Sequence, residues 1–227
     1  MTPSMVQCAK CPADPGLRAC RIQEGDGPEF CPTIHMEPVI ERARQRYHDR
    51  EIREFARQAS IQEAEGYAGR GPGPYVRHPV KPRLQEIWEF AGRMGYKRLG
   101  VAFCAGLLKE GRLLVEVLEK HGFEVVSVVC KVGCTPKEEI GITDGEKIRV
   151  GQFEAMCSPI AQAEILNEAG TELNILMGLC VGHDSLFFKH SRAPVTVFAA
   201  KDRVLGHNPM AALYTLDTYY ERLVEGG

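Results

Sequence analysis

The residues of this chain that could do chemistry are its nine cysteines, which fall into two groups separated by a long stretch without cysteine. The first group, called here the N-terminal thiols, consists of Cys8, Cys11, Cys20 and Cys31. The second group consists of Cys104, Cys130, Cys134, Cys157 and Cys180. Four thiolates are the ligand set that a tetrahedral zinc ion or a four-iron cluster requires. Each group is therefore large enough to hold a metal.

Disulfide bonds are a poor explanation for these cysteines. The opening MTPSMVQCAKCP has neither the basic nor the apolar segment of a secretory signal, and no apolar run approaches the ~18 residues that span a bilayer. We therefore expect a cytoplasmic protein without a membrane partner. Disulfides are rare in that reducing compartment, and an odd number of cysteines would leave one unpaired. Two explanations for the cysteines remain, namely metal ligation and burial as small apolar side chains.

Three cysteines of the second group stand where predicted strands end. Cys104 follows RLGVAF, Cys130 follows FEVVSVV, and Cys180 follows ELNILMGL. In an open parallel sheet, ligands bind outside the carboxyl ends of the strands, so residues distant in sequence can share one site there. Cys157 lies just before a helix predicted to be capped by Ser158, and the amino end of a helix favours a thiolate. We expect these four cysteines, called here the edge thiols, to bind one metal together.

The alternative is that the edge thiols are only buried apolar side chains, which is common for a single cysteine in a strand. Three cysteines at equivalent strand ends, each beside a glycine-containing turn, favour the shared metal site. Cys134 is a spare, four residues after Cys130. It could be a replacement ligand, a redox thiol or a residue without a role.

Polar side chains cluster at the same predicted edge of the sheet. They follow Cys180 and the predicted strand APVTVFAA, and they are His183, Asp184, Lys201, Asp202, Arg203 and His207. Beside a metal, such groups supply proton donors and positive charge, so we predict that they are catalytic or bind an anion. Ordinary roles also exist, because Asp184 fits a helix cap and a histidine or lysine in a loop is often simply solvated.

The N-terminal thiols contain one C-x2-C pair of the kind that grips zinc, without the second pair of a zinc ribbon. The Cys11-Pro12 and Cys31-Pro32 steps are typical of bacterial ferredoxins, so an iron–sulfur cluster is also expected as a candidate. A segment of about 35 residues with few large apolar side chains cannot build its own core. A metal is the simplest reason for it to fold, and a disordered tail is the alternative.

The elements that must position these residues follow from periodicity. From Lys97 onward, short apolar segments alternate with amphipathic helical ones, which predicts a parallel sheet with helices on both faces. We therefore expect a Rossmann-like α/β domain over residues 96–227. Before it, residues 37–96 carry apolar side chains at helical spacing. We expect residues 1–95 to form a cysteine-rich and helical N-terminal region.

The charge balance limits the class of partner. Lys and Arg together number 28 and Asp and Glu 30, for a net charge of -2, and 44% of residues are hydrophobic. This composition excludes a disordered chain and gives no electrostatic reason to expect nucleic acid. The arginine-rich run ERARQRYHDREIREFAR also carries acidic residues at helical offsets, which favours a solvated helix face over an RNA-binding arm.

The stretches GVAFCAGL, VVCKVGC, CSPIAQAEILN, NILMGLCVGHDSLFFKHSRAPVT and KDRVLGHNPMAALY resemble a family known as domain of unknown function 1847. The resemblance covers nearly the whole chain, including the N-terminal thiols. It implies that the edge thiols and the six polar residues after Cys180 occupy the family's motif positions. Where the family usually has CNPI, this chain has CSPI at residues 157–160, which affects only a capping residue. Members of that family are labelled metal-binding proteins and occur mainly in anaerobes, which shifts the expected metal towards iron–sulfur.

Together these observations predict an iron–sulfur protein. A [4Fe-4S] cluster at the edge thiols would either transfer electrons to a redox partner protein or bind a small anionic ligand at an exposed iron. The alternative is a non-enzymatic protein in which zinc is structural at both groups of cysteines, and zinc is considered especially for the N-terminal thiols. The residues by themselves name no reaction, substrate or oligomeric state.

Overall fold

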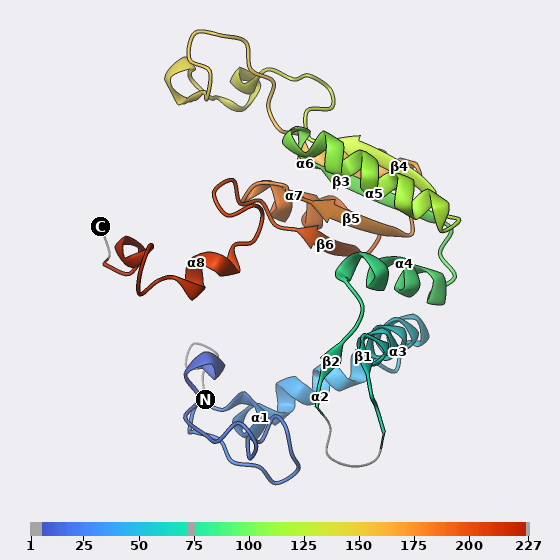
Figure 1. Cartoon of the computed structure of the whole chain (residues 1–227), viewed down its shortest axis with the longest axis vertical. Coiled ribbons are helices and arrows are strands. Elements are labelled where there is room, and N and C mark those ends of the chain that lie inside the picture. The colour runs from blue at the N-terminus through green and yellow to red at the C-terminus, as the bar shows by residue number, and fades with distance from the viewer. Residues whose placement is uncertain (1–5, 72–75, 226–227) are drawn as a thin grey trace. The chain divides into compact units, whose positions relative to one another are not determined.

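The computed structural model describes residues 6–71 and 76–225 of the 227-residue chain (Figure 1). The chain divides into two compact units, Met1–Glu63 and Ala64–Gly227. Helix α4 (Arg83–Arg93) belongs to the second unit, because its Ile87 and Ala91 are buried in the same core as the strands. The prediction from sequence had placed these residues in the N-terminal region, residues 1–95.

The first unit is a cysteine-bearing segment followed by helices. A short 3-10 helix spans Cys8–Lys10, α1 spans Pro32–His35, α2 spans Glu37–Arg46 and α3 spans Arg50–Glu65. Asp49 begins α3, because its carboxylate accepts hydrogen bonds from the backbone N–H groups of Glu51 and Ile52 at 2.8 and 3.0 Å. These bonds satisfy two of the donors that the amino end of a helix leaves free. The helices expected before the α/β domain are thus present.

The second unit is built on a four-stranded parallel sheet, as the sequence predicts. Its strands are β3 (Arg98–Phe103), β4 (Glu124–Val129), β5 (Leu173–Met177) and β6 (Val195–Ala199), in the spatial order β4-β3-β5-β6. Figure 1 shows these strands side by side with helices against them. A separate antiparallel pair, β1 (Tyr67–Ala68) with β2 (His78–Pro79), precedes α4.

Helices cover both faces of the sheet. They are α5 (Leu108–Lys120), α6 (Pro159–Glu168) and α7 (His183–His190) together with α4. One core contains side chains of α4 and α5, such as Leu114 and Leu118, against β3 and β5. The other contains Leu166 of α6 and Phe187 of α7 against the opposite face. Successive residues of a strand point to opposite faces of the sheet, and both faces of β3 and β5 are covered by helices. Their sequences are therefore nearly continuous apolar runs rather than alternating ones.

The order of the strands reverses between β3 and β5. The chain runs from β3 through α5 to β4 on one side, then returns through α6 to β5 on the other side of β3. Such a reversal leaves a crevice at the carboxyl ends of the two strands, which is where doubly wound sheets bind their ligands. The fold therefore directs attention to the residues that follow β3 and β5.

A long connection joins β4 to α6 and is called here the excursion loop, residues 131–157. It contains 3-10 helices at Lys137–Ile140 and Asp144–Glu146. The second of these begins at Asp144-Gly145, a dipeptide that is typical of turns, and the side chains of Thr143 and Glu146 cap it. Few side chains of the excursion loop are buried, so the loop depends on polar contacts for its conformation.

The carboxyl-terminal segment is less helical than the sequence predicts. Leu213, Leu216, Tyr220 and Leu223 recur near helical spacing after Asn208, which predicts one helix, but α8 covers only Met210–Tyr214, and a 3-10 helix follows at Glu221–Leu223. Apolar side chains of this segment, including Tyr219, are exposed among the described residues. Without a packing partner, an amphipathic sequence lacks the main source of helical stability.

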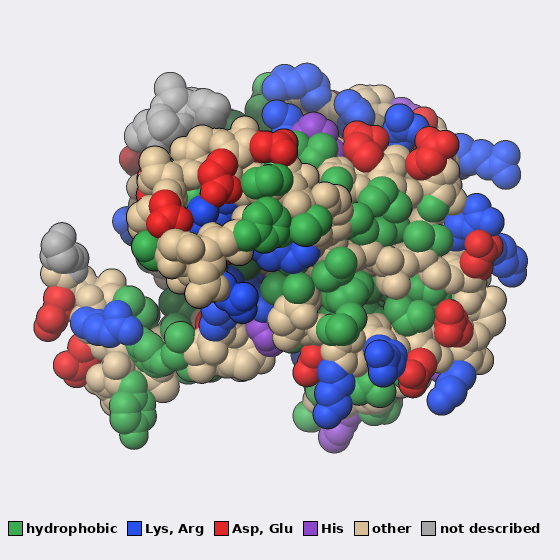
Figure 2. All heavy atoms as spheres, turned by 90° about the horizontal axis from the view of Figure 1, so that it is seen from above, with side chains coloured by type: hydrophobic (Ala, Val, Ile, Leu, Met, Phe, Trp, Pro, Cys, Tyr) green, Lys and Arg blue, Asp and Glu red, His purple; other side chains and the backbone are tan. Residues whose placement is uncertain are grey.

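No helix among the described residues combines the length and the hydropathy needed to cross a membrane. On the face shown in Figure 2, basic side chains are interspersed with acidic and apolar ones rather than gathered in one continuous patch. That distribution provides no long stretch of positive potential for a polyanion on this face.

Candidate functional site

The edge thiols are placed by the carboxyl ends of the strands, as predicted. Cys104 directly follows β3, Cys130 directly follows β4, and Cys180 comes three residues after the end of β5. Cys157 is the residue before Ser158, the N-cap of α6. Helical segments begin just after Cys104, Cys157 and Cys180, so the amino ends of three helical segments lie in this region, where the helix dipole favours negative charge.

Cys130 is the centre of the group. It is only 2% exposed, and its Sγ lies 3.8 Å from Sγ of Cys157. The same sulfur accepts a hydrogen bond from the backbone N–H of Ala105 at 3.3 Å, and it also interacts with the Cys104 sulfur. The tertiary structure therefore brings together three thiols from three segments of the chain.

Each of the other three edge thiols has its own cation. Nζ of Lys201 lies 3.2 Å from Sγ of Cys104, and a guanidinium nitrogen of Arg203 lies 3.0 Å from Sγ of Cys180. The third cation is Lys131, which donates to the carbonyl oxygen of Ala155 and hydrogen-bonds to Cys157. A cation at hydrogen-bond distance favours the charged form of a thiol.

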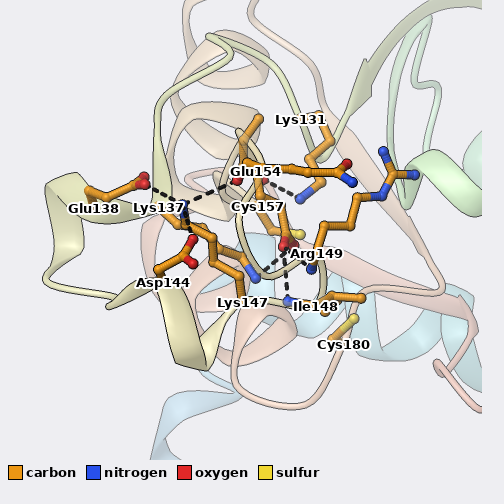
Figure 3. A network of polar contacts seen from close by, with 12 residues as sticks. Lys131, Lys137, Glu138, Asp144, Lys147, Ile148, Arg149, Glu154, Cys157 and Cys180 are labelled. Carbon is orange, nitrogen blue, oxygen red and sulfur yellow. Dashed lines mark hydrogen bonds and ion pairs between the residues drawn. The ribbon is translucent and has the colours of Figure 1, made fainter.

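Lys131 is a residue that the sequence analysis missed. It comes directly after Cys130, and Figure 3 shows its side chain extending towards the region of Cys157. The feature of the sequence that indicates its role is a lysine immediately after a cysteine at a strand end. Lys201 and Arg203, by contrast, belong to a longer run of polar residues.

The close packing of the thiols lowers the pKa values of two of them and raises the pKa of the third. The pKa of Cys104 falls to about 4, chiefly because the Cys130 thiol hydrogen-bonds to it, with the Gly106 N–H and Lys201 contributing. The pKa of Cys157 falls to about 5 because of the same Cys130 thiol and the nearby charges of Lys131 and His183. The pKa of Cys130 is raised, because its two thiol neighbours and its burial favour the protonated form.

The remaining polar residues of the predicted cluster divide into two kinds. His183 begins α7, and its charge lowers the pKa of Cys157. Its Nδ1 is buried without a partner among the described residues. Asp184, by contrast, accepts a hydrogen bond from the backbone N–H of Ser185, so its carboxylate serves the first turn of the helix.

Asp202 and His207 form a closed turn around Arg203. The Asp202 carboxylate accepts hydrogen bonds from the N–H groups of Val204 and Leu205 at 2.9 and 2.8 Å. Nδ1 of His207 accepts from the Asp202 N–H at 3.1 Å, and the His207 N–H donates to the Asp202 carbonyl oxygen at 2.9 Å. These two residues therefore shape the loop that carries Arg203, whereas Lys201, Arg203 and His183 lie at the thiols.

The excursion loop fixes Cys157 through a network of polar contacts (Figure 3). The Glu154 carboxylate pairs with Lys137 at 2.7 Å and accepts hydrogen bonds from the N–H groups of Ile148 and Arg149. The largest effect of this network on Glu154 is the Lys137 bond, which lowers the pKa of the carboxyl. Cys134 is exposed in this loop and has a left-handed backbone, with φ of 50°.

A further network in the loop centres on Lys147. Its side chain is almost fully buried and pairs with Asp144 at 3.1 Å and with Glu138. The Asp144 carboxylate also accepts from the Gly151 N–H at 2.8 Å. Together with the Glu154 contacts, these bonds hold the loop in one conformation although it contributes little to the apolar core.

The N-terminal thiols converge separately in the first unit. All four line one cavity of about 160 Å³, which is also lined by apolar side chains and by Arg18 and Asp26. Cys8 and Cys20 are exposed, and Cys11 and Cys31 are half-buried. The four cysteines that the sequence analysis treats as one group thus lie around one cavity of the structure.

Neither group of thiols is already drawn into the geometry of a metal site. Within residues 6–71 and 76–225, no set of three or more His, Cys, Asp or Glu side chains has an arrangement that could hold a metal ion. The close pair at the edge is Cys130 and Cys157, and Cys104 and Cys180 are each held by a cation. Ligation would therefore bring the four sulfurs closer together than they lie here.

Comparison with known proteins identifies relatives of this chain. The family described as "Protein of unknown function (DUF1847)" matches residues 31–198. An uncharacterized protein from Methanocaldococcus jannaschii is 49% identical over 175 residues, which cover 77% of this chain and 86% of that protein. The family match includes the edge thiols, His183 and Asp184, but it ends before Lys201. It also leaves out Cys8, Cys11 and Cys20, so it is shorter than the resemblance noted from sequence.

Proposed function

The chain belongs to the family of proteins of unknown function DUF1847, and we propose that it binds a single soft metal ion, such as zinc, through the edge thiols and a small anion beside that metal. The observation that carries the proposal is the distance of 3.8 Å between Sγ of Cys130 and Sγ of Cys157. Two thiolates on one zinc ion, each about 2.3 Å from the metal in a tetrahedral arrangement, lie about 3.8 Å apart.

The chemistry of the donor set supports the same ion. The group offers four soft sulfur donors, and zinc requires deprotonated thiols. Cys104 and Cys157, whose pKa values lie near 4 and 5, are deprotonated at neutral pH. Cys130 and Cys180 would also bind the metal as thiolates, so the proton on Cys130 would leave when a metal binds. When bound, the ion supplies positive charge and Lewis acidity.

The cations around the thiols support an anionic ligand. A divalent ion with four thiolates carries a net charge of minus two. Lys131, Lys201 and Arg203 together more than balance that charge, so the surroundings stay positive. His183 adds a proton donor or acceptor, because its buried Nδ1 has no partner among the described residues. A small carboxylate or phosphate is the chemical class that fits this charge.

The iron–sulfur cluster expected at this edge from sequence stays a prediction. In a cubane, each cysteine binds its own iron, so the sulfurs lie farther apart than two ligands of one ion. The short separation of Cys130 and Cys157 therefore favours the single ion, which was the alternative. A purely structural zinc would not need Lys201, Arg203 and His183 around it.

Metal analysis of matched variants of the full-length chain tests the proposal. The chain is purified without oxygen, and zinc, iron and acid-labile sulfide are measured per chain. We expect Cys157→Ser to lose about one equivalent of zinc relative to the unmodified chain, because one ligand is removed. Cys134→Ser is the matched control, because it removes an exposed cysteine from the same loop, and it should keep its zinc.

Two results would overturn the proposal. One is a Cys157→Ser variant with the same metal content as the Cys134→Ser control. The other is a loss of iron and sulfide, instead of zinc, in Cys157→Ser, which would restore the cluster at the edge thiols. Circular dichroism of both variants shows whether the parallel-sheet unit remains folded, so that metal loss is not confused with unfolding.

A further inference from the structure

The N-terminal thiols come from separate pieces of the first unit and meet at one cavity. Cys8 begins the short 3-10 helix and Cys11 ends it, Cys20 lies in the following loop, and Cys31 is the residue before α1. The loop is closed on itself, because the N–H of Ala19 donates to the Asp26 carbonyl oxygen at 2.8 Å. The four side chains thus surround a common space rather than following one another along a helix.

The size of that space distinguishes the metals. The cavity measures about 160 Å³, whereas about 10–15 Å³ is enough for one water molecule. Four thiolates on a single zinc ion would stand about 3.8 Å apart, so a single ion would require these cysteine loops to close in further than a cluster would. The cavity therefore has room for a group of several atoms.

The walls of the cavity are unsuited to water. Apart from the cysteines, they include the apolar side chains of Ala19, Pro28, Phe30 and Pro32. Ordered water in a cavity needs two to four polar partners, and a largely apolar wall supplies few. The Arg18 guanidinium, meanwhile, donates to the carbonyl oxygens of Ala13 and Cys11, which holds the segment around Cys11 in place.

Two glycines allow the backbone to approach this cavity closely. A Cβ atom at Gly27 would lie 2.8 Å from Sγ of Cys31, and a Cβ atom at Gly25 would lie 2.6 Å from the Leu17 carbonyl oxygen. Both distances are too short for a real side chain. The backbone at Gly25 and Gly27 therefore fits against the cysteine loops only because neither residue has a Cβ atom.

The cysteine segment has no apolar core of its own. None of the residues 6–61 is buried, and the first buried side chain among the described residues is Gln62 in α3. Conformational entropy of about 1–2 kcal/mol per residue opposes the ordering of such a segment. Binding to a metal centre supplies the compensating free energy in small domains of this kind.

We propose that Cys8, Cys11, Cys20 and Cys31 hold a [4Fe-4S] cluster in this cavity. The cubane contains four irons and four sulfides, which matches a multi-atom space lined by four thiols. All four irons would then have a cysteine ligand, so the cluster has no open position for a substrate. Its chemical role is to accept and donate single electrons and to hold the segment folded. The proposal is independent of the metal at the edge thiols.

The experiment uses the full-length chain purified under anaerobic conditions. We expect brown protein with an absorbance shoulder near about 400 nm and about four irons and four sulfides per chain. Reduction with dithionite should bleach the shoulder and give a paramagnetic signal of one reduced cluster in electron paramagnetic resonance. Cys20→Ser should lose most of the iron and sulfide, whereas Cys157→Ser and Cys134→Ser should keep them.

A gentler variant probes the cavity without removing a ligand. Gly27→Ala adds a Cβ atom beside Sγ of Cys31, and we expect it to lower cluster occupancy at least twofold. Gly92→Ala, at a helical glycine with nothing near its Cβ position and no left-handed backbone, is a control for the handling of glycine variants in the cluster assay.

Three results would overturn the cluster. Colourless protein with zinc that is lost in Cys20→Ser would show a single ion instead. Protein with neither iron nor zinc in the first unit would show that the cavity holds no metal. Iron and sulfide lost in Cys157→Ser but kept in Cys20→Ser would place the cluster at the edge thiols. A loss of zinc alone in Cys157→Ser leaves this proposal standing, so the two proposals fail separately.

Discussion

At the scale of single residues, three of the edge thiols each lie beside a basic side chain, and they surround a thiol whose raised pKa favours the protonated form. Cys104 and Cys180 face Lys201 and Arg203 at 3.2 and 3.0 Å. Cys130 faces no such cation among the described residues and instead lies between thiols. This arrangement lets several sulfurs carry negative charge close together, because each charge has a nearby partner and Cys130 donates rather than repels.

The pH dependence of alkylation follows from these pKa values. In metal-free protein, Cys104 and Cys157 have pKa values near 4 and 5, so both are already thiolates at pH 6. We expect their rates of reaction with iodoacetamide to change less than about twofold between pH 6 and pH 8, whereas an ordinary thiol of pKa ~8.5 speeds up by nearly two orders of magnitude. Peptide mass spectrometry measures each rate, with glutathione as the ordinary thiol.

Lys201→Ala provides the matched comparison for that measurement. Removing the ammonium should raise the pKa of Cys104 and move its alkylation profile towards higher pH, by less than the Cys130 thiol lowers it, while Cys157 keeps its profile. Rates at Cys104 and Cys157 that climb with pH in the unmodified protein would contradict the charge arrangement.

If the proposed anion site exists, variants of its residues should lose anion binding while the protein stays folded. Lys201→Ala and His183→Ala should keep the metal content and the circular dichroism spectrum, because neither residue is a proposed ligand. Both should lose at least tenfold in affinity for inorganic phosphate, measured as a ligand-dependent shift in melting temperature. Arg192→Ala is the control, because Arg192 is exposed and not among the residues at the thiols. Unfolding of Lys201→Ala or His183→Ala would make those residues structural.

At the scale of elements, buried polar contacts align the ends of the strands that carry the cysteines. The amide nitrogen of the fully buried Gln162, on α6, donates to the carbonyl oxygens of Phe103 and Val128 at 3.2 and 2.7 Å. Phe103 directly precedes Cys104, and Val128 lies two residues before Cys130. A helix on one face of the sheet is thus tied to the two strands whose ends form the site.

Lower in the sheet, Gly100 makes room for a buried polar side chain. Asn174 of β5 is fully buried, and its amide nitrogen donates to the Ser191 hydroxyl at 2.8 Å. A Cβ atom at Gly100 would lie only 2.0 Å from Oδ1 of Asn174. The neighbouring strands therefore need glycine at this position.

Gly100→Ala should lower the free energy of unfolding of the second unit by about 1–3 kcal/mol, as overpacked cores do. Gly92→Ala is the control, because Gly92 lies in α4 with nothing near its Cβ position. In a helix, that change should be neutral or stabilise by up to about 1 kcal/mol. Urea unfolding followed by circular dichroism measures both, and equal midpoints for the two variants would refute the steric account.

At the scale of the whole molecule, the two groups of thiols belong to different compact units. The edge thiols lie in a unit with two apolar cores, whereas the N-terminal thiols lie in a segment whose described residues, 6–61, include none that is buried. A metal bound at each group, as proposed, would therefore contribute differently to the stability of each unit. In the second unit it would add to an apolar core, and in the first it would take the place of one.

Loss of an N-terminal ligand should accordingly have a local effect. We expect Cys11→Ser to lower the metal content and to remove protection from amide hydrogen exchange over residues 6–36, while residues 98–199 keep theirs. Hydrogen exchange followed by mass spectrometry measures both ranges in one experiment, and Cys134→Ser is the control. Unchanged protection over 6–36 would show that the segment folds without its metal.

The sequence by itself determined the parallel sheet, its flanking helices and the positions of the cysteines at strand ends. These features depend on local patterns, since apolar runs, helical periodicity and glycine turns act within a few residues. Cys104, Cys130 and Cys180 were placed correctly because a parallel sheet brings the carboxyl ends of its strands to one edge. The sequence also indicated the family to which the chain belongs.

The tertiary structure alone decided which side chains meet. It placed α4 against the sheet, directed Lys131 to Cys157, and used Asp202 and His207 to shape a loop. It also gave the close pair of sulfurs at the edge and the open cavity in the first unit, the two observations from which the metals proposed above are argued. Such distances depend on how segments pack after the chain has folded, and no periodicity within a window of sequence encodes them.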